Sequence, residues 1–234
     1  MKTFIANWKM NGSISQLKLY CDELNSASLQ SCNLILALPS VYLLTAKKLI
    51  KNDHIHLASQ TLSPHSHGAY TGQISAPMLK EIGCQYALVG HSERRDFESN
   101  EDIEHQIHQC ITHKITPILC FGETRKEREQ GLTNQVLLDQ IQFAINQPQI
   151  SQHILLAYEP RWAIGTGSPP STNEIKSMLS FLKEQTTVPI LYGGSVSRDN
   201  AKNILTTGVN GLLIGGASLD CNHLLDIIAQ YQLV

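Results

Sequence analysis

Two Gly-Gly turns near the end of the chain have the composition of a phosphate-binding site. They are Tyr192-Gly193-Gly194-Ser195-Val196 and Ile214-Gly215-Gly216-Ala217-Ser218, and each follows a short apolar run. Glycine lets the backbone approach an anion closely and exposes N–H groups, and the start of a following helix adds a positive end. One Gly-Gly pair would more simply indicate a tight turn. Two of them, after successive apolar runs, favour a bound phosphate.

Two other segments contain side chains that could move protons. Gly90-His91-Ser92-Glu93-Arg94-Arg95 places a histidine after an apolar run, where it could act as an acid or base or polarise a carbonyl. Tyr158-Glu159-Pro160 places a carboxylate after another run, either as a base or as a fixed ion-pair partner. The stretch from Arg161 to Gly167 that follows is long enough to close as a lid. Closure would expel water and raise the pKa of the carboxyl group, which would make it a stronger base.

A regular alternation of elements would have to position these residues. Eight short β-rich runs are predicted as strands: Thr3–Trp8, Leu34–Leu38, Ile55–Ser59, Tyr86–Gly90, Pro117–Phe121, Ile154–Glu159, Pro189–Gly193 and Gly211–Gly215. Eight longer amphipathic runs are predicted as helices: Ser15–Ser28, Tyr42–Lys51, Ala76–Cys84, Glu101–His113, Thr133–Asn146, Thr172–Gln185, Arg198–Leu205 and Leu219–Gln230. Thr133, Thr172 and Ser197 are the candidate helix caps.

The strands are almost continuously apolar, which is typical of a parallel sheet buried on both faces. Eight strand–helix units in 234 residues give about 29 residues per unit, so we predict one domain, residues 1–234, with an eight-stranded parallel (β/α)8 barrel. An open doubly wound sheet is the alternative. In a barrel, the polar residues that follow the strands converge on the carboxyl-end mouth, where barrel enzymes have their active sites.

The composition excludes several classes of protein. Hydrophobic residues make up 42% and charged residues 16%, which excludes a disordered chain. The net charge of −2 provides no general attraction to nucleic acid or to an anionic membrane. No segment has the length and apolarity of a signal peptide or a membrane span, and the six cysteines are scattered as buried thiols would be. We therefore expect a cytoplasmic protein. The histidine pairs His105/His108 and His65/His67 lack a third nearby ligand, so we expect no metal site.

Five motifs in order give the chain a resemblance to the triosephosphate isomerase family. They are Asn7-x-Lys9, the Gly-His-Ser-Glu-Arg-Arg run, Tyr-Glu-Pro followed by Trp-Ala-Ile-Gly-Thr-Gly, Tyr-Gly-Gly-Ser-Val and Leu-Ile-Gly-Gly-Ala-Ser-Leu, and they span residues 5–219. The resemblance implies interconversion of glyceraldehyde 3-phosphate and dihydroxyacetone phosphate, in glycolysis and gluconeogenesis, through an enediolate. It implies no metal and no other cofactor.

The resemblance also implies roles for single residues. Glu159 matches the family's base, and His91 matches a neutral electrophile, which a helical turn near Ser92 would help to keep uncharged. Lys9 matches the cation that faces the enediolate, with Asn7 as a nearby donor. The residues that match the phosphate site are Gly165, Ser195, Gly215 and Gly216. The supporting residues are Glu93 beside Lys9, Ser92 beside the resting base, and Cys120 as packing next to Glu159.

Some residues differ from the family's pattern. Arg161 stands where a small apolar residue is usual at the first lid hinge, and Ser168-Pro169-Pro170 could stiffen the second. The resemblance implies a homodimer, in which the loop carrying Thr71 docks into a second subunit. Gln73 in that loop replaces a usual glutamate, so we expect a weakened or altered interface.

Two other functions remain open from the residues alone. A phosphate-handling barrel could be an aldolase that uses Lys9 as a Schiff-base amine, which borohydride trapping with substrate would reveal. The barrel could also be a catalytically inactive binding module. The presence of Lys9, His91 and Glu159 at one predicted rim argues against the second alternative.

Overall fold

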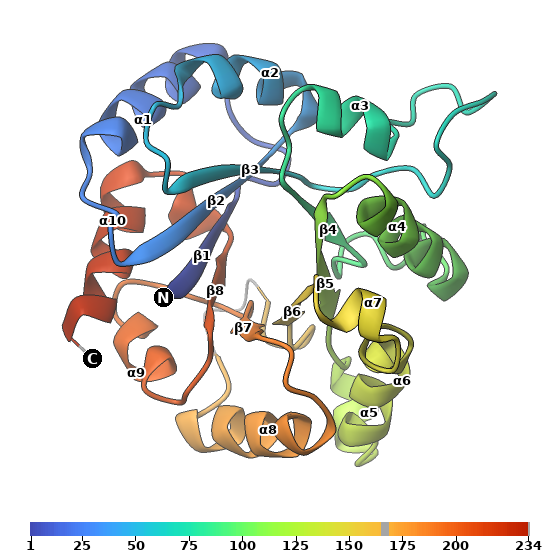
Figure 1. Ribbon diagram of the computed structural model, residues 1–234. Coiled ribbons are helices and arrows are strands. Elements are labelled where there is room, and N and C mark those ends of the chain that lie inside the picture. The colour runs from blue at the N-terminus through green and yellow to red at the C-terminus, as the bar shows by residue number, and fades with distance from the viewer. Residues whose placement is uncertain (165–168, 234) are drawn as a thin grey trace.

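The computed structural model describes residues 1–164 and 169–233. Its strands form a closed barrel in which every neighbouring pair is parallel and the spatial order is the chain order (Figure 1). The strands are β1 (Lys2–Asn7), β2 (Cys32–Leu38), β3 (Ile55–Ser59), β4 (Tyr86–Val89), β5 (Thr116–Phe121), β6 (Leu155–Tyr158), β7 (Ile190–Tyr192) and β8 (Gly211–Ile214). The predicted (β/α)8 barrel is confirmed.

The sheet closes where β1 pairs with β8, with Thr3 opposite Gly211. A Cβ atom on Gly211 would lie 1.8 Å from the carbonyl oxygen of Thr3, which is far inside van der Waals contact. Glycine is therefore required for the last strand to reach the first. This closure excludes the open doubly wound sheet.

Helices surround the barrel (Figure 1). In the described residues they are α1 (Ile14–Ser26), α2 (Ser40–Leu49), α3 (Ala76–Glu81), α4 (Asn100–Thr112), α5 (Arg125–Glu129), α6 (Thr133–Ile145), α7 (Pro148–Ser151), α8 (Thr172–Gln185), α9 (Ala201–Leu205) and α10 (Cys221–Ala229), with the 3₁₀ turns η1 (Gly216–Ser218) and η2 (Gln230–Leu233). The short helices α5 and α7 were not predicted, because a helix of four or five residues is too short to show a 3.6-residue period.

The predicted helix caps were wrong. Helix α8 is capped by Ser171, whose side chain forms a capping box with Glu174, three residues further on, so the cap lies one residue before Thr172. Helix α6 begins after Leu132 with no side-chain cap, and α9 begins after Asn200. Helix α4 has a second capping box, formed by Ser99 and Asp102, that the sequence analysis missed.

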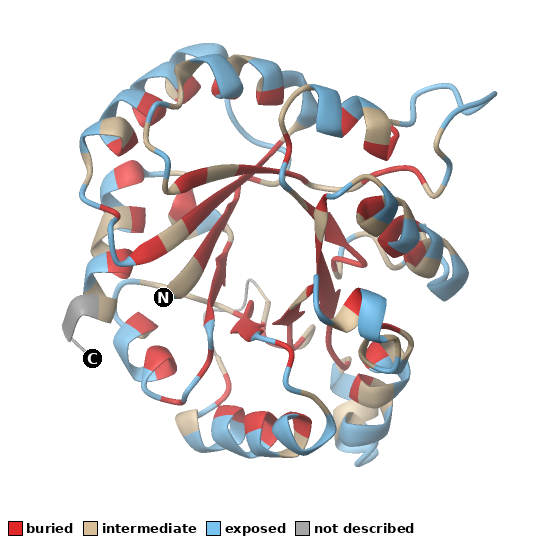
Figure 2. Ribbon diagram, in the orientation of Figure 1, coloured by how far each residue is buried: buried red, intermediate tan, exposed pale blue. Residues whose placement is uncertain are grey.

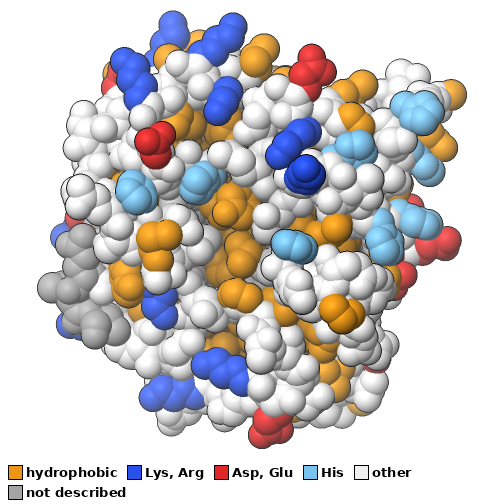
Figure 3. Space-filling view, in the orientation of Figure 1, with side chains coloured by type: hydrophobic (Ala, Val, Ile, Leu, Met, Phe, Trp, Pro, Cys, Tyr) orange, Lys and Arg blue, Asp and Glu red, His pale blue; other side chains and the backbone are white. Residues whose placement is uncertain are grey.

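Apolar side chains form two layers that differ by one position along each strand. One layer fills the inside of the barrel, and the other lies between the barrel and the helices. Figure 2 shows buried residues along the strands and on the inner sides of the helices, and Figure 3 shows hydrophobic side chains in the middle of this face of the molecule. The interior is therefore a packed core and not a pore.

This alternation decides which polar residues enter the mouth of the barrel. Side chains two positions apart on a strand point to the same face, so the residue two places after an inward apolar one also points inward. Ile5, Ala157, Leu191 and Leu213 all belong to the inner layer. Two residues after each of them come Asn7, Glu159, Gly193 and Gly215. The barrel thus directs these four positions to its carboxyl-end mouth.

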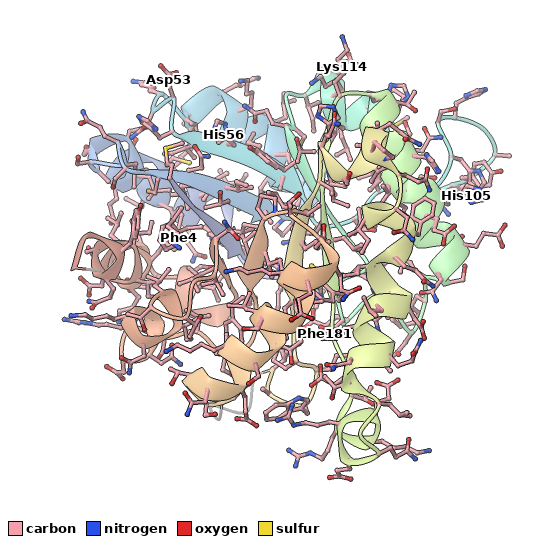
Figure 4. The ribbon with its side chains drawn as sticks, turned by 60° about the horizontal axis from the view of Figure 1, so that its bottom comes forward. Phe4, Asp53, His56, His105, Lys114 and Phe181 are labelled. Atoms are coloured by element: carbon pink, nitrogen blue, oxygen red, sulfur yellow. The ribbon has the colours of Figure 1, made fainter. Side chains whose placement is uncertain are left out.

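The opposite rim carries other titratable groups. In Figure 4, Asp53, His56 and Lys114 lie along one edge, and these residues are at or just before the starts of β3 and β5. His105 lies on α4 at the outside of the molecule (Figure 4). Among the described residues there is no group of three or more His, Cys, Asp or Glu that could hold a metal ion. None of the helices in the described part is long and apolar enough to cross a bilayer.

Candidate active site

A pocket of about 300 Å³ opens at the carboxyl ends of the strands. The side of the pocket formed by β1, β4 and β6 provides Asn7, Lys9, His91 and Glu159, and the side formed by β7 and β8 provides mainly glycine and serine backbone. The residues that line it are Asn7, Lys9, His91, Glu159, Ile164, Gly193, Gly194, Ser195, Val196, Ser197, Asn200, Leu213, Gly215 and Gly216. The structure thus brings the predicted polar residues from five strands to one cavity.

Lys9 is held in an unusual backbone conformation beside the pocket. Its φ of 51° is in the left-handed region, which a residue with a Cβ rarely adopts. Its N–H donates to Asn7 Oδ1 at 3.0 Å, and its Nζ lies 2.5 Å from Glu93 Oε1. A strained backbone of this kind persists only where the surroundings hold it in place, which is common at functional sites.

Gln60 is one of the residues that fix this loop, and the sequence analysis did not assign it a role. Its Nε2 donates to the carbonyl oxygens of Lys9 at 2.9 Å and Ala37 at 3.0 Å. It therefore ties the lysine to the end of β2. The available signal was its position directly after β3, the same kind of strand end that identified the other candidates.

His91 and Glu159 are in direct contact, which the sequence did not predict. His91 Nε2 lies 3.1 Å from Glu159 Oε1, and both side chains are almost completely buried. The backbone N–H of Glu93 donates to His91 Nδ1 at 3.2 Å, so Nδ1 acts as an acceptor and the ring proton is placed on Nε2, toward the carboxylate. The backbone N–H of Ser92 donates to Glu159 Oε2 at 3.2 Å. Ser92 is thus beside the carboxylate, but through its backbone.

The charge of His91 depends on opposing effects. Burial disfavours the charged ring, but the negative charge of Glu159 and its hydrogen bond outweigh burial, so the pKa of His91 is raised above 6.5. The hydrogen bond from the Glu93 N–H to Nδ1 favours the neutral ring instead, because it requires Nδ1 to be unprotonated. In this arrangement the carboxylate favours the charged ring, whereas the expectation from the sequence is a neutral electrophile.

Two glycines that contact Glu159 could not be replaced by residues with a side chain without a clash. A Cβ on Gly193 would lie 3.0 Å from Glu159 Cγ, and a Cβ on Gly122 would lie 1.8 Å from the Glu159 carbonyl oxygen. Cys120 is fully buried, and this burial is the main reason why the pKa of its thiol is raised well above the ordinary value. The negative charge of Glu159 raises that pKa further. Cys120 thus stays a neutral thiol, which fits packing and not nucleophilic attack.

The glycine-rich side of the pocket is open to a ligand. A Cβ on Gly216 would meet nothing within 4 Å, and one on Gly215 would meet only Lys9 Cε at 3.6 Å. Ser195 Oγ donates to the carbonyl oxygen of Ala163 at 2.7 Å, while Asn200 Nδ2 donates to the Ser195 carbonyl at 3.0 Å. Gly165, the remaining predicted phosphate residue, lies outside the described residues, as does Ser168.

A buried carboxylate that follows β5, Glu123, holds the chain on both sides of Glu159. Tyr158 Oη donates to it at 3.1 Å and Trp162 Nε1 donates to it at 2.9 Å, while its carbonyl oxygen accepts the N–H of Arg161 at 3.0 Å. The sequence analysis did not assign Glu123 a role. Its position after a strand was again the signal.

Arg161, the unusual residue at the start of the predicted lid, forms an ion pair with exposed Asp96 at 3.6 Å. Asp96 lies on the same turn as Ser92 and Glu93, so this pair links the segment after β6 to the turn after β4. An exposed pair of this kind contributes little to stability.

The pocket therefore combines a buried carboxylate, an imidazole with its proton on Nε2 and a fixed ammonium group, opposite an open glycine backbone. A carboxylate can remove a proton, an imidazole can donate one, and a cation can stabilise the resulting oxyanion. The glycine backbone suits a phosphate, and the small pocket volume suits a small molecule. Such a set can isomerise a phosphorylated α-hydroxy carbonyl compound.

Comparison with known proteins points to the same chemistry. The family model described as triosephosphate isomerase matches residues 2–231. Proteins named triosephosphate isomerase are similar to the chain: one from Chlamydia muridarum is 40% identical, covering 96% of this chain and 89% of its own length. One from Ralstonia nicotianae is 36% identical, with 97% of each chain covered, and one from Aquifex aeolicus is 37% identical, with 97% and 98% covered. This chain therefore belongs to the triosephosphate isomerase family.

Proposed function

We propose that this enzyme interconverts glyceraldehyde 3-phosphate and dihydroxyacetone phosphate at the pocket described above, with Glu159 as the base. The observation that carries the assignment of residues is the convergence of Lys9, His91 and Glu159, from the ends of β1, β4 and β6, on one small cavity. These three groups are the minimum set that an enediolate mechanism needs: a base, a proton donor for the carbonyl oxygen and a cation.

The first step breaks a C–H bond of the bound triose next to its carbonyl group. Glu159 takes the proton, and the electron pair of the C–H bond forms the carbon–carbon double bond while the carbonyl oxygen becomes negative. Gly193 leaves space for the carboxylate beside the substrate, because any side chain there would contact Glu159 Cγ. Burial of Glu159 excludes water that would compete for the proton.

The second group of steps moves protons between oxygens. His91 Nε2 donates its proton to the carbonyl oxygen and receives one from the neighbouring hydroxyl, which requires the ring proton on Nε2 that the Glu93 N–H favours. Lys9 stabilises the negative oxygen, and Asn7 helps to hold the lysine backbone. Glu159 then returns its proton to the adjacent carbon, so the reaction consumes no other reactant.

The phosphate group is assigned to the side of β7 and β8. Ser195, Gly215 and Gly216 contribute to the lining there, and the open space over Gly216 allows an anion to approach its backbone. Gly165 and closure of the predicted lid over this phosphate stay predictions. Binding energy from the phosphate can position the reacting carbons without changing their chemistry.

An aldolase that forms a Schiff base at Lys9 is less well supported. A Schiff base needs an amine nitrogen that is free to attack a carbonyl carbon, whereas Lys9 Nζ is held 2.5 Å from Glu93 Oε1 in an ion pair. Borohydride trapping with dihydroxyacetone phosphate should leave Lys9 unmodified. A trapped adduct would support the aldolase instead.

A coupled assay tests the proposal directly. The purified enzyme should convert glyceraldehyde 3-phosphate to dihydroxyacetone phosphate, and phosphoglycolate, which resembles the enediolate in charge and size, should compete tightly. Absence of turnover, with intact folding, would support an inactive binding module. Turnover that phosphoglycolate does not affect would reject the assigned phosphate and enediolate sites.

We also infer a homodimer from the loop between β3 and α3. This loop projects from the body of the molecule (Figure 1), and Thr71 in it is exposed. Beside it lies a second cavity of about 490 Å³, edged by Met10 and Phe97, whose exposed fractions of 95% and 79% are high for apolar residues. An exposed apolar border around a cavity is typical of a protein–protein interface, which supports docking of a second copy. Gln73 accepts a hydrogen bond from Ser63 Oγ at 2.6 Å, so in each subunit it braces the base of its own loop.

The remaining proposals concern the whole chain. We propose that residues 1–234 form a single domain, because β1 and β8, from opposite ends of the chain, pair to close one sheet. We propose a cytoplasmic location, which the six free cysteines support, since thiols stay reduced there.

A further inference from the structure

One guanidinium group on α5 contacts the chain on both sides of residues 163–170. Arg128 Nη1 lies 3.4 Å from Glu123 Oε1, and its Cζ lies 4.5 Å from the centre of the Trp162 ring. Arg128 Nη2 also forms an ion pair with Glu174 in the first turn of α8. Helix α5 and the start of α8 are thus joined through a single side chain.

Each contact of Arg128 has a distinct physical effect. Glu123 is completely buried, and a buried carboxylate without a counter-charge is very unfavourable, so Arg128 compensates its charge. The flat guanidinium packs on the Trp162 ring in a cation–π arrangement, which an ammonium group reproduces less well. Glu174 pairs with Nη2 of the guanidinium while Glu123 pairs with Nη1, and the other oxygen of Glu174 caps α8 through Ser171.

These contacts act on the segment that carries Glu159. Glu123 binds Tyr158 and Trp162, which lie on either side of Glu159 in the sequence. If Glu123 or Trp162 shifts, the chain between residues 158 and 162 shifts with it. An error of about 1 Å in the position of a catalytic group can lower the rate about a hundredfold.

We propose that Arg128 is a positioning residue for the reaction, which holds Glu123 and Trp162 so that residues 158–162 present Glu159 correctly to the substrate, with Glu174 fixing the guanidinium. This inference rests on the proposed role of Glu159 as the base. A purely structural ion pair would affect folding but would not change the turnover of the folded enzyme.

The test uses variants that avoid leaving a buried charge alone. R128K keeps the charge but loses the flat face, and E174Q keeps an oxygen for the α8 cap but loses the charge that holds Arg128. The double variant E123Q/R128M removes the buried charge and its partner together. R125M, on an exposed arginine of the same helix, is the matched control.

Two readouts separate positioning from folding. The first is kcat and KM for glyceraldehyde 3-phosphate, corrected for the folded fraction. The second is acrylamide quenching of tryptophan fluorescence, which reports on Trp162 because the other tryptophan, Trp8, is fully buried. A group that only stabilises the fold would change neither.

We expect kcat to fall about tenfold or more in E123Q/R128M and about two- to fivefold in R128K and E174Q, with KM changing less than about threefold. Quenching of Trp162 should increase in the same order, and R125M should match the wild type. Wild-type kcat and quenching in both R128K and E174Q would overturn the proposal, even if the double variant does not fold. A loss of kcat in R125M equal to that in R128K would also overturn the proposal.

The test distinguishes this inference from the proposed function. Full activity of E159Q would remove the base assignment, whereas quenching of Trp162 in the Arg128 variants measures the clamp without any chemistry. Increased quenching with unchanged kcat would show that Arg128 holds Trp162 but does not position the base.

Discussion

At the scale of single residues, the site depends on groups that are held by hydrogen bonds to the backbone. Lys9 has a left-handed backbone that Asn7 and Gln60 hold by hydrogen bonds, and His91 receives a backbone N–H on Nδ1. The contact of His91 with Glu159 places the proposed base beside the proposed proton donor.

Replacing Glu159 with glutamine tests the base. The amide has nearly the same shape as the carboxylate but accepts no proton at neutral pH, so we expect kcat to fall about 10²- to 10⁴-fold. Phosphoglycolate binding should weaken much less than kcat, because the glycine side of the pocket is unchanged. The measurement is steady-state kinetics together with inhibitor titration. Turnover within a few-fold of the wild type would contradict the assignment.

The pairing of His91 with Glu159 predicts how stability depends on pH. The pKa of His91 is raised in the folded state, so the folded protein binds this proton more tightly than the unfolded chain, whose histidine has a pKa near about 6.5. The contribution of His91 is therefore fully present below about pH 6.5, and it is lost as the pH rises through the higher folded-state value.

Urea unfolding of the wild type and H91Q, at pH values below and above about 6.5, measures how the contribution of His91 to the free energy of unfolding changes with pH. The difference in free energy of unfolding between the wild type and H91Q should be largest at low pH. It should become smaller as the pH rises. A difference that grows with pH would show that the folded state lowers the pKa of His91 instead.

At the scale of elements, the hydrogen bonds at the start of helix α8 help to order the chain near the site. Helix α8 begins directly after the predicted lid, and Ser171 and Glu174 satisfy its free N–H groups in a capping box. The same Glu174 pairs with Arg128, so this cap is connected to the segment that carries Glu159. In the corresponding box on α4, Ser99 and Asp102 bond to each other.

Replacing Ser171 with alanine tests this difference between the two caps. Loss of an N-cap side chain costs about 1 kcal/mol of stability, so S171A and S99A should lower the free energy of unfolding by similar amounts. Only S171A should also lower kcat, since it loosens Glu174. T172A, next to the cap, is the control and should remain close to the wild type. Equal kcat values in S171A and S99A would contradict a link between the α8 cap and the segment that carries Glu159.

At the scale of the whole molecule, the exposed apolar side chains of Met10 and Phe97 beside the projecting loop support the proposed homodimer. Phe97 replaced by aspartate should leave the subunit folded, because the side chain is already mostly exposed, but should shift a dimer toward the monomer. L19D, on an exposed leucine of α1, is the matched control. Sedimentation velocity at several concentrations measures the outcome. A wild type that is monomeric and fully active would reject the homodimer.

The sequence alone determined the number and order of the strands, because a parallel barrel buries both faces of every strand and leaves eight apolar runs at regular spacing. It also identified Lys9, His91 and Glu159 as candidates, because each follows such a run. Helix starts were less predictable: Ser171 and not Thr172 caps α8, since the deciding factor is a three-residue spacing to Glu174. Helices α5 and α7 are too short to leave a periodic pattern.

Only the tertiary structure decided which groups touch. The contact of His91 with Glu159 joins residues 68 positions apart, and the support of Lys9 by Gln60 joins residues 51 positions apart. Arg128 joins Glu123, which is five positions away, to Glu174, which is 46 positions further along the chain. The contacts between strand ends depend on closure of the barrel, where Gly211 allows the backbone of Thr3 to approach. Residue type and spacing describe each strand by itself, whereas the distance between two strand ends depends on how the whole sheet closes.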